Sequence, residues 1–490
     1  MSSKPIRNVL SIKQNFLFNA LNSVTGILFP LIAFPYAARI LFSDGIGQVQ
    51  FLSSIIGYIT LFTSLGIPLY AVREIAKVRN NEKLLSRTAL EILILNAMLM
   101  FLGYLVVAIF IRFVSKIQAN IPLFLILSLS ILLNTIGCEW FYRGIEDFRY
   151  ITIRNFIARS ISLALLFLLV KTHNDILWYG TYTTIGVSGG YIFNFFRLRK
   201  SLDFDGIRLK DLSPMKHLKP SFHIFLLNLT ASIYIYLNTI MLGFMTDDNT
   251  VGYYTGATKI TQITLGIITS LGFIMIPRLS NLISLGKKEE FNRLANKSIE
   301  FVIGISLPLT VGLIILAPTL VRLICGDMFE PSILVLQIIA PITFFIALSN
   351  VIGIQILYPQ GQENTVILST LVGASVGLIL NLLLIPGMAQ VGTAISTVLA
   401  ECSVALTQLT IGGSFLSVKF FTRSHGNYFL GTILMGIGVY GISLLHLPDK
   451  VNIVIIPIVG IVIYGIFLLV RKDLLCLEVI SSLRNKILRK

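Results

Sequence analysis

Residues 120–142 read NIPLFLILSLSILLNTIGCEWFY, and no charged side chain occurs in this stretch before Glu139. A helix that crosses the hydrocarbon core of a bilayer needs about 20 largely apolar residues. The stretch therefore predicts a membrane-spanning helix with Glu139 near one end. Comparable stretches recur along the chain, whose mean hydropathy is +0.84. Only 13% of its residues are charged, against about 25% in soluble domains. The predicted fold class is an all-α polytopic membrane protein.

We predict about fourteen membrane-spanning helices of this kind. Their expected ranges are 14–40, 48–69, 88–112, 120–142, 152–171, 176–196, 221–243, 252–277, 299–323, 332–358, 365–386, 390–411, 427–446 and 451–470. Most of the 39 Lys and Arg residues fall in alternate gaps between these spans, whereas the intervening gaps hold only Arg112, Lys116, Lys171 and Lys450. Because cytoplasmic loops are enriched in Lys and Arg, we expect both termini to be cytoplasmic. The net charge of +16 then reflects topology, and we expect no nucleic-acid partner.

The end of the fourth span is repeated later in the chain. Residues 134–142 (NTIGCEWFY) align with residues 350–358 (NVIGIQILY) at an offset of 216, with identical Asn, Ile, Gly and Tyr residues. Gly47 and Arg73 likewise match Gly252 and Arg278 at an offset of 205. Spans one to six therefore repeat as spans seven to twelve in parallel orientation, and repeated lobes commonly bind substrate between them. The predicted divisions are an N-terminal lobe (1–196), a cytoplasmic linker (197–220), a C-terminal lobe (221–412) and two further spans with a cytoplasmic tail (413–490).

The sequence carries no sign of an enzyme active site or a resident cofactor. No P-loop, Ser/His/Asp set or group of metal ligands stands out. The 4 cysteines show neither metal-site spacing nor a disulfide pattern. We therefore expect no catalytic residues, no metal and no cofactor.

Polar residues inside the spans are the candidate site residues, because the bilayer core penalises polar groups that do not face protein or water. Here they recur three or four residues apart, on single helix faces. They include Asn19 and Asn22 in the first span, Arg159 in the fifth, Lys259 and Gln262 in the eighth, and Thr397 and Glu401 in the twelfth. Amides and hydroxyls often serve only to join helices. Deep charges point to function instead, since an unpaired charge in mid-bilayer costs ~3 kcal/mol or more.

Three segments resemble a known family. They are residues 34–41 (FPYAARIL), 64–76 (SLGIPLYAVREIA) and, most specifically, 139–155 (EWFYRGIEDFRYITIRN). They are similar to bacterial polysaccharide repeat-unit flippases, the Wzx-type members of the multidrug/oligosaccharidyl-lipid/polysaccharide exporter superfamily. The resemblance covers most of the chain in topology, while the last two spans match only in hydropathy.

This resemblance implies two six-helix lobes plus two C-terminal helices, in the bacterial inner membrane. It also implies a substrate: an oligosaccharide on undecaprenyl pyrophosphate, flipped from the cytoplasmic to the outer leaflet by alternating access for O-antigen, capsule or exopolysaccharide assembly. Other polysaccharide assembly proteins are then candidate partners. Cations suit a diphosphate, whereas amides and hydroxyls suit a glycan. The candidate cations are Arg39, Arg159 and Lys259, and the candidate glycan ligands are Asn19, Asn22, Gln262 and Thr397.

Two further roles are assigned as hypotheses. Glu401, near mid-bilayer, is the candidate ion-coupling residue, with the coupling ion (H⁺ or Na⁺) left open; the alternative is a protonated Glu that only packs within its lobe. A second set lies where the fourth span meets the cytoplasm and forms either an inner gate or an ordinary surface cluster of ion pairs. Its members are Glu139, Tyr142, Arg143, Glu146 and Asp147.

Three other functions compete with the flippase interpretation. A drug/cation antiporter of the same superfamily needs acidic residues in its cavity, but deep cations outnumber deep acids here. A membrane glycan polymerase or ligase usually carries a long outer loop, and the predicted outer loops are short. A subunit without transport activity does not explain charges kept inside the spans.

The charge pattern makes a direct topological prediction. Single cysteines introduced in the 197–220 linker are expected to react with a membrane-impermeant thiol reagent only after the cell is opened, because the linker is predicted to be cytoplasmic. Cysteines at Asp247 or Asp248 are expected to react in intact cells. Labelling of the linker in intact cells would refute the two-lobe topology.

Overall fold

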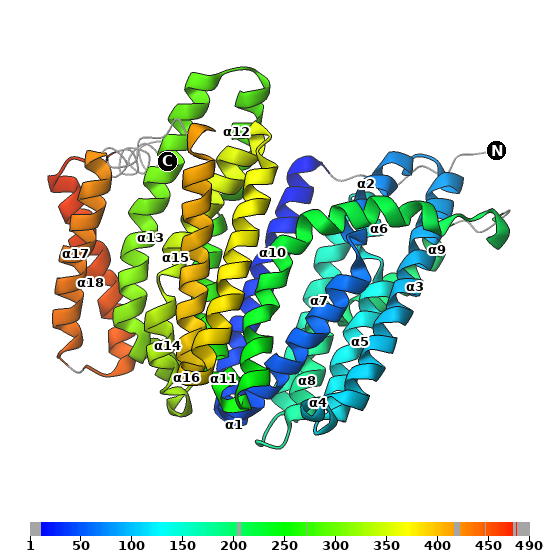
Figure 1. Cartoon of the computed structure of the whole chain (residues 1–490), viewed down its shortest axis with the longest axis horizontal. Coiled ribbons are helices and arrows are strands. Elements are labelled where there is room, and N and C mark those ends of the chain that lie inside the picture. The colour runs from blue at the N-terminus through cyan, green and yellow to red at the C-terminus, as the bar shows by residue number, and fades with distance from the viewer. Residues whose placement is uncertain are drawn as a thin grey trace. The chain divides into compact units, whose positions relative to one another are not determined.

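The computed structural model describes residues 11–202, 207–270, 272–415, 422–445, 447–473 and 477. All regular secondary structure in these ranges is helical, so the all-α prediction is confirmed (Figure 1). The chain divides into two compact units, Met1–Ile240 and Met241–Lys490. This division lies inside a helix and not at the predicted 197–220 linker. The extreme N-terminus and most of the tail, which we predict to be cytoplasmic, lie outside the described residues.

The helices of the first unit follow the predicted spans. They are α1 (Ile12–Ser64), α2 (Ile67–Val78), α3 (Glu82–Phe113), α4 (Ser115–Gln118), α5 (Ile121–Gly137), α6 (Glu139–Gly144), α7 (Phe148–Leu169), α8 (Ile176–Thr184), a π-helical turn (Ile185–Gly189), α9 (Tyr191–Ser201), two 3₁₀ turns (Leu209–Asp211 and Pro214–His217) and most of α10 (Leu218–Met245).

The second unit continues in the same way. Its helices are α11 (Asp248–Ser270), α12 (Gly272–Ser284), α13 (Lys288–Ile324), a 3₁₀ turn (Asp327–Phe329), α14 (Ser332–Ile339), α15 (Ile342–Ser349), a π-helix (Asn350–Leu357), a 3₁₀ turn (Tyr358–Gln360), α16 (Glu363–Ile411), a 3₁₀ turn (Gly413–Phe415), α17 (Arg423–Ser443) and α18 (Asp449–Val470).

Two of the long helices are each a pair of helices joined by a sharp break. In α1 the break is at Phe42, whose φ is 55°, and Figure 1 shows the two halves running in different directions. In α16 the break is at Ala389, whose φ is 46°. Predicted spans lie on both sides of each break. By length and composition, 8 helical stretches of the described chain can cross a membrane, and two of these contain the breaks. The count of about fourteen spans stays a prediction.

The repeated motif interrupts the α-helix in both units. In the first unit α5 ends at Gly137, and Cys138 adopts a left-handed conformation (φ 43°) before α6 starts at Glu139. In the second unit the matching residues form the π-helix Asn350–Leu357. Single-turn π-helical segments are common at functional sites. Both copies of the motif therefore interrupt the regular α-helix, but they do so with different local conformations.

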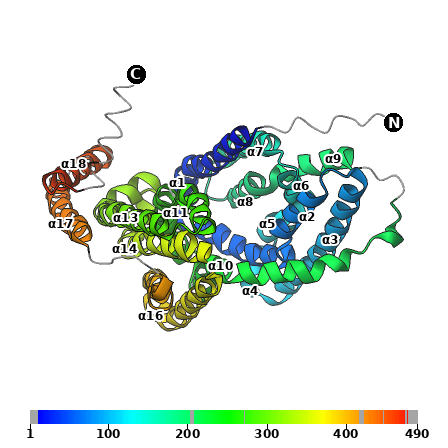
Figure 2. The same cartoon turned by 90° about the horizontal axis from the view of Figure 1, so that it is seen from above.

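Helices α17 and α18, which stand outside the repeat, form a hairpin at the edge of the second unit beside α13 (Figures 1 and 2). Leu316 of α13 packs there with Met435, Val439 and Ile456. That these two helices are an addition to the repeated lobes stays a prediction.

Part of the predicted 197–220 linker is fastened to the first unit by a buried carboxylate, Glu91 of α3. Glu91 is 0% exposed and accepts hydrogen bonds from the Ser213 backbone N–H (3.0 Å) and Arg87 Nε (3.2 Å). Its other oxygen lies 2.5 Å from Lys216 Nζ and 3.2 Å from His217 Nε2. The segment before α10 is therefore held against α3 by charge.

His217 extends this attachment to α2, because its Nδ1 lies 2.7 Å from the Tyr70 hydroxyl. Burial lowers the pKa of His217, although the neighbouring Glu91 opposes that shift. The ring is therefore neutral at neutral pH. A neutral imidazole has one donor and one acceptor nitrogen, so Nε2–H donates to Glu91 and Tyr70 donates to Nδ1.

Replacing Glu91→Gln is expected to loosen the 207–217 segment, because an amide cannot accept from all four donors and leaves the cations unbalanced. We expect a local loss of about 1–3 kcal/mol, measured as faster amide hydrogen exchange in this segment. Glu74→Gln is the matched control, since Glu74 pairs with two largely exposed cations, Arg73 and Lys77, and such pairs contribute about 0–1 kcal/mol. Equal exchange in the two variants would contradict the role of Glu91.

Candidate functional site

The candidate site in the first unit lies between the first half of α1 and α7. Arg159 Nη1 donates to the Asn22 carbonyl (3.0 Å) and to Thr25 Oγ1 (2.7 Å), and lies 3.4 Å from Asn22 Oδ1. A Cβ added to Gly26 would lie 3.5 Å from Arg159 Nη2. The guanidinium therefore rests on α1 directly over a glycine.

A continuous series of hydrogen bonds links Arg159 to the end of the fourth predicted span. Asn155 Nδ2 donates to Asn22 Oδ1 (3.0 Å), and Arg154 donates through Nε (3.2 Å) and Nη2 (2.7 Å) to Asn155 Oδ1. Arg154 Nη2 also pairs with Glu139 Oε2 at 2.8 Å, and Arg143 Nη2 with Glu139 Oε1 at 2.6 Å. We call this series the polar chain; it comprises Arg143, Glu139, Arg154, Asn155, Asn22, Arg159 and Thr25.

The polar chain carries more positive than negative charge. It contains three guanidinium groups and one carboxylate, Glu139. The Arg154 side chain is only 2% exposed, and its guanidinium carbon lies 5.9 and 5.2 Å from the ring centroids of Tyr150 and Tyr191. Arg154 Nη1 is buried without a hydrogen-bond partner. One carboxylate cannot neutralise three cations, so the site favours an anion.

Arg154 was not named as a site residue from the sequence, although it lies near the start of the predicted span 152–171. The signal that could have found it is its spacing on α7. Arg154 follows Tyr150 by four residues on α7, so the two side chains lie on the same face of the helix. It directly precedes Asn155 and precedes Arg159 by five residues, so it lies on the turn between Tyr150 and Arg159.

The other candidates of the first unit lie apart from the polar chain. Asn19 is exposed, and Arg39 is exposed near the break of α1 at Phe42. At 1.5 Å per residue, Arg39 lies about 25 Å along the helix from Asn22. The structure thus brings together Asn22 and Arg159 but places Arg39 elsewhere on α1.

In the second unit the candidates lie on two helices in contact, α11 and α16. The Tyr254 hydroxyl is 3.0 Å from Thr397 Oγ1, and both spans run in the same predicted direction. One turn further on, Lys259 and Glu401 therefore lie at similar depth. Glu401 is buried (6% exposed), Lys259 is half-buried and Gln262 is exposed. Lys259 and Glu401 do not form an ion pair within 4.0 Å.

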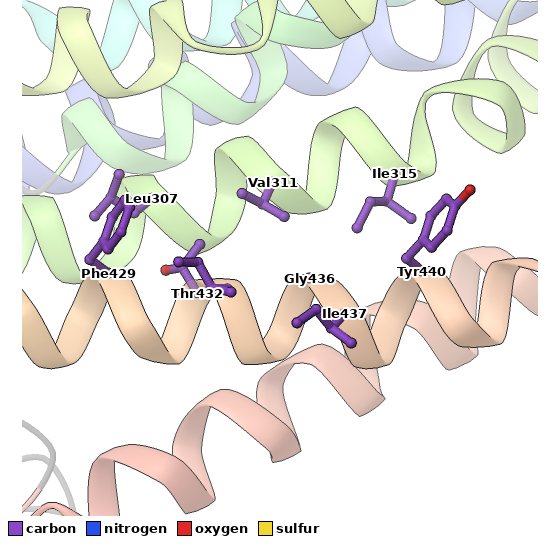
Figure 3. A pocket seen from close by; sticks show the side chains of 9 residues that line it. Leu307, Val311, Ile315, Phe429, Thr432, Gly436, Ile437 and Tyr440 are labelled. Atoms are coloured by element: carbon purple, nitrogen blue, oxygen red, sulfur yellow. The ribbon is translucent and has the colours of Figure 1, made fainter.

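A separate apolar cavity of about 440 Å³ lies between α13 and α17. Figure 3 shows its side chains facing one another from these two helices. It is lined by Leu307, Val311, Ile315, Phe429, Thr432, Ile433, Gly436, Ile437 and Tyr440. With two hydroxyls and no charge, the cavity suits hydrocarbon and not a phosphate. In the residues that the structure describes, no group of three or more His, Cys, Asp or Glu side chains is arranged to hold a metal.

A family model described as polysaccharide biosynthesis protein matches residues 12–283, more than half of the chain. The chain belongs to the polysaccharide biosynthesis protein family. A second model, described as lipid II flippase MurJ, matches residues 156–448, so the two overlap and together span both units. The resemblance to Wzx-type flippases is thereby confirmed.

Curated relatives of this family member include two transporters. The chain is 27% identical over 402 residues to a putative O-antigen transporter of Shigella dysenteriae, covering 81% of this chain and 99% of that protein. It is 24% identical to a putative O-antigen transporter of Escherichia coli strain K12, covering 82% and 97%. These relatives agree with the prediction of a transporter and not an enzyme.

Solved structures agree on the fold. The lipid II flippase MurJ in an inward closed conformation has a TM-score of 0.71 at 18% identity, covering 94% of this chain and 100% of that one. An inward-facing MATE family multidrug transporter has a TM-score of 0.65 at 15% identity, covering 82% and 98%. At these identities the comparison shows a common transporter fold alone.

The predicted gate residues of this family member make their contacts within the first unit. Glu146 pairs with Arg79, the residue that follows α2 (2.7 Å), and Asp147 pairs with Arg197 of α9 (2.7 Å). Tyr142 is fully buried and donates to the Asn194 carbonyl (2.8 Å), so its place is in the interior of the unit. Glu139 and Arg143 belong to the polar chain. A gating role for this set stays a prediction.

Alanine substitutions separate a gate from a surface cluster. If the pairs open and close during transport, Arg143→Ala and Glu146→Ala are expected to change the flipping rate several-fold at normal protein level. Exposed pairs of purely structural origin contribute about 0–1 kcal/mol and leave the rate unchanged. Transport assays normalised to the amount of folded protein distinguish the two. Wild-type rates in both variants would remove the gate hypothesis.

Proposed function

We propose that this protein flips an oligosaccharide linked to undecaprenyl pyrophosphate from the cytoplasmic to the outer leaflet of the bacterial inner membrane, by alternating access. The observation that carries the proposal is the excess of guanidinium groups on the polar chain between α1 and α7. The transporters among the relatives support a glycan destined for a surface polysaccharide. The identity of its sugars is left open.

The charge excess suits a diphosphate for a physical reason. An unpaired charge at mid-bilayer costs ~3 kcal/mol or more, so a membrane protein keeps one only where a counter-charge arrives. Arginine binds phosphate oxygens in a two-pronged geometry, and such charge-assisted hydrogen bonds are about twice as strong as neutral ones. Arg159 uses only Nη1 for its bonds to α1, which leaves its other nitrogens for a ligand.

The second unit supplies a proposed coupling device. Glu401 is buried at the depth of Lys259, and the two are not paired in this structure. We propose that an anionic headgroup bound near Lys259 favours an uncharged Glu401, which links substrate binding to uptake of a proton. A Na⁺ ion is the alternative coupling ion.

A drug/cation antiporter is the second candidate, because the fold is shared with MATE transporters. Such a carrier needs a net negative cavity to hold a cation. The polar chain has the opposite sign, with three guanidinium groups to one carboxylate. An anionic substrate is therefore the stronger proposal, and proteins that make or polymerise the same glycan are its expected partners.

Removing the cations tests the proposal. Arg159→Ala and Lys259→Ala are each expected to slow flipping of undecaprenyl-pyrophosphate-linked oligosaccharide by about tenfold or more, since a hydrogen bond to a charged group contributes about 1.5–3 kcal/mol. Lys259→Arg is expected to be milder because it keeps the charge. Arg39→Ala is expected to have a smaller effect.

Arg149→Ala is the matched control, because Arg149 is an exposed arginine on the same helix as Arg159. Flipping is measured in proteoliposomes as the appearance of the glycan in the opposite leaflet. Wild-type rates in the Arg159 and Lys259 variants would overturn electrostatic capture by these residues.

Glu401→Gln tests the coupling. The amide keeps the shape and hydrogen-bonding capacity of a protonated Glu but cannot titrate. We expect flipping by the variant to lose its dependence on an imposed pH gradient while the protein stays folded. If the variant responds to gradients as the wild type does, Glu401 is not the coupling residue.

A further inference from the structure

The bonds of Arg159 leave one edge of its guanidinium unengaged. Nη1 is bound to α1 through Asn22 and Thr25. Among the described residues, none accepts a hydrogen bond from Arg159 Nε or Nη2. Gly26 lies beneath Nη2 with no side chain to cover it. The free edge therefore has the two-pronged donor geometry that fits one phosphate group.

The orientation of this guanidinium depends on two asparagines, and their amides are set by Arg154. Arginine has five N–H donors and no acceptor. Because Arg154 Nε and Nη2 both donate to Asn155 Oδ1, the nitrogen of Asn155 must face Asn22. Asn22 Oδ1 accepts from that nitrogen. The Asn22 Oδ1 atom therefore also faces Arg159 Nη1, 3.4 Å away. Turning either amide over would set donor against donor.

Arg154 is itself fixed on three sides. Glu139 pairs with Nη2, and the rings of Tyr150 and Tyr191 lie close to the guanidinium. A Cβ added to Gly190 would come within 3.1 Å of Arg154 Nε, so the helix backbone closes around the side chain. A buried, immobile donor of this kind can impose one orientation on a neighbouring amide.

We infer that Arg154, Asn155 and Asn22 are positioning residues, which hold Arg159 so that its Nε–Nη2 edge meets one phosphate group of an anionic lipid. This inference rests on the proposed function. The three residues act through Arg159, and their contribution is the geometry of that group and not its charge. Removing the middle residue, Asn155, leaves every charge of the polar chain in place but frees Asn22 to turn and Arg159 to move.

The test is a double-mutant cycle on the full-length protein in lipid nanodiscs, with undecaprenyl pyrophosphate as the probe. Asn155→Ala is expected to weaken binding about five- to tenfold, because Arg159 keeps its charge but loses its fixed orientation toward the phosphate. Arg159→Ala is expected to weaken it further. Residues that act through one another are not additive, so the double variant is expected to bind no worse than Arg159→Ala alone.

Thr152→Val is the matched control. The Thr152 hydroxyl joins α7 to the Phe18 carbonyl of α1 at 2.8 Å, one turn from Asn155, and lies outside the polar chain. The substitution removes a bond between the same two helices, so it reproduces any general loosening of their packing. Near-wild-type binding in this variant, together with the non-additive pair, supports the inference. If the double variant weakens binding by the product of the two single effects, the inference is wrong.

Arg154→Lys is a second, independent variant. It keeps the positive charge beside Glu139 but cannot make both bonds to Asn155 Oδ1. We expect Arg154→Lys to weaken binding of the probe as much as Asn155→Ala does. In an Arg159→Ala background, neither substitution is expected to weaken binding further. If wild-type protein does not bind the probe, the inference falls together with the proposed function. If wild type binds and depends on Arg159 while Arg154→Lys binds normally, only the inference falls.

Discussion

The structure depends on the cost of placing charge inside a bilayer. Arg154 is buried in a predicted span, and removing the partner of a buried ion pair costs about 3–5 kcal/mol. Its pairing with Glu139 therefore constrains where α6 and α7 meet, and the bonds that continue through Asn155 and Asn22 constrain where α1 lies on α7. Helix positions that would be weakly defined by contacts between apolar side chains are specified here by groups that must be satisfied.

The same requirement accounts for the difference between the two copies of the repeated motif. Glu139 of the first copy corresponds to Gln355 of the second. Glu139 holds two arginines, whereas Gln355 is buried in a π-helix, 3.5 Å from Asn350. A carboxylate is needed where cations are buried beside it; without them an amide avoids a buried charge. The second unit has its candidate charges on other helices, at Lys259 and Glu401, so the two units contribute different chemistry to one transporter.

The segment before α10 is held by electrostatic interactions too. Glu91 accepts hydrogen bonds and ion pairs from α3 and from the chain before α10, so this segment is held against α3 within the first unit. Because Glu91 is buried, breaking the attachment would leave its carboxylate without partners, at a cost of about 1–3 kcal/mol or more.

The sequence by itself determined the all-α membrane class and the family, and it named four members of the polar chain as candidates: Asn22 and Arg159 for the substrate, and Glu139 and Arg143 for the gate. The class follows from hydropathy, the candidates follow from helical spacing and position in the spans, and the family follows from the resemblance of residues 34–41, 64–76 and 139–155; all of these are local properties of the chain. Only the tertiary structure decided that Arg154 is a buried member of the polar chain, that Arg39 lies far from Arg159, that Tyr142 is interior, and that Lys259 and Glu401 lie at similar depth without forming an ion pair. Each of these depends on which faces of separate helices meet, and a one-dimensional pattern does not contain that information. The breaks at Phe42 and Ala389 were expected as turns between spans, but the conformations that make them sharp depend on packing around each bend.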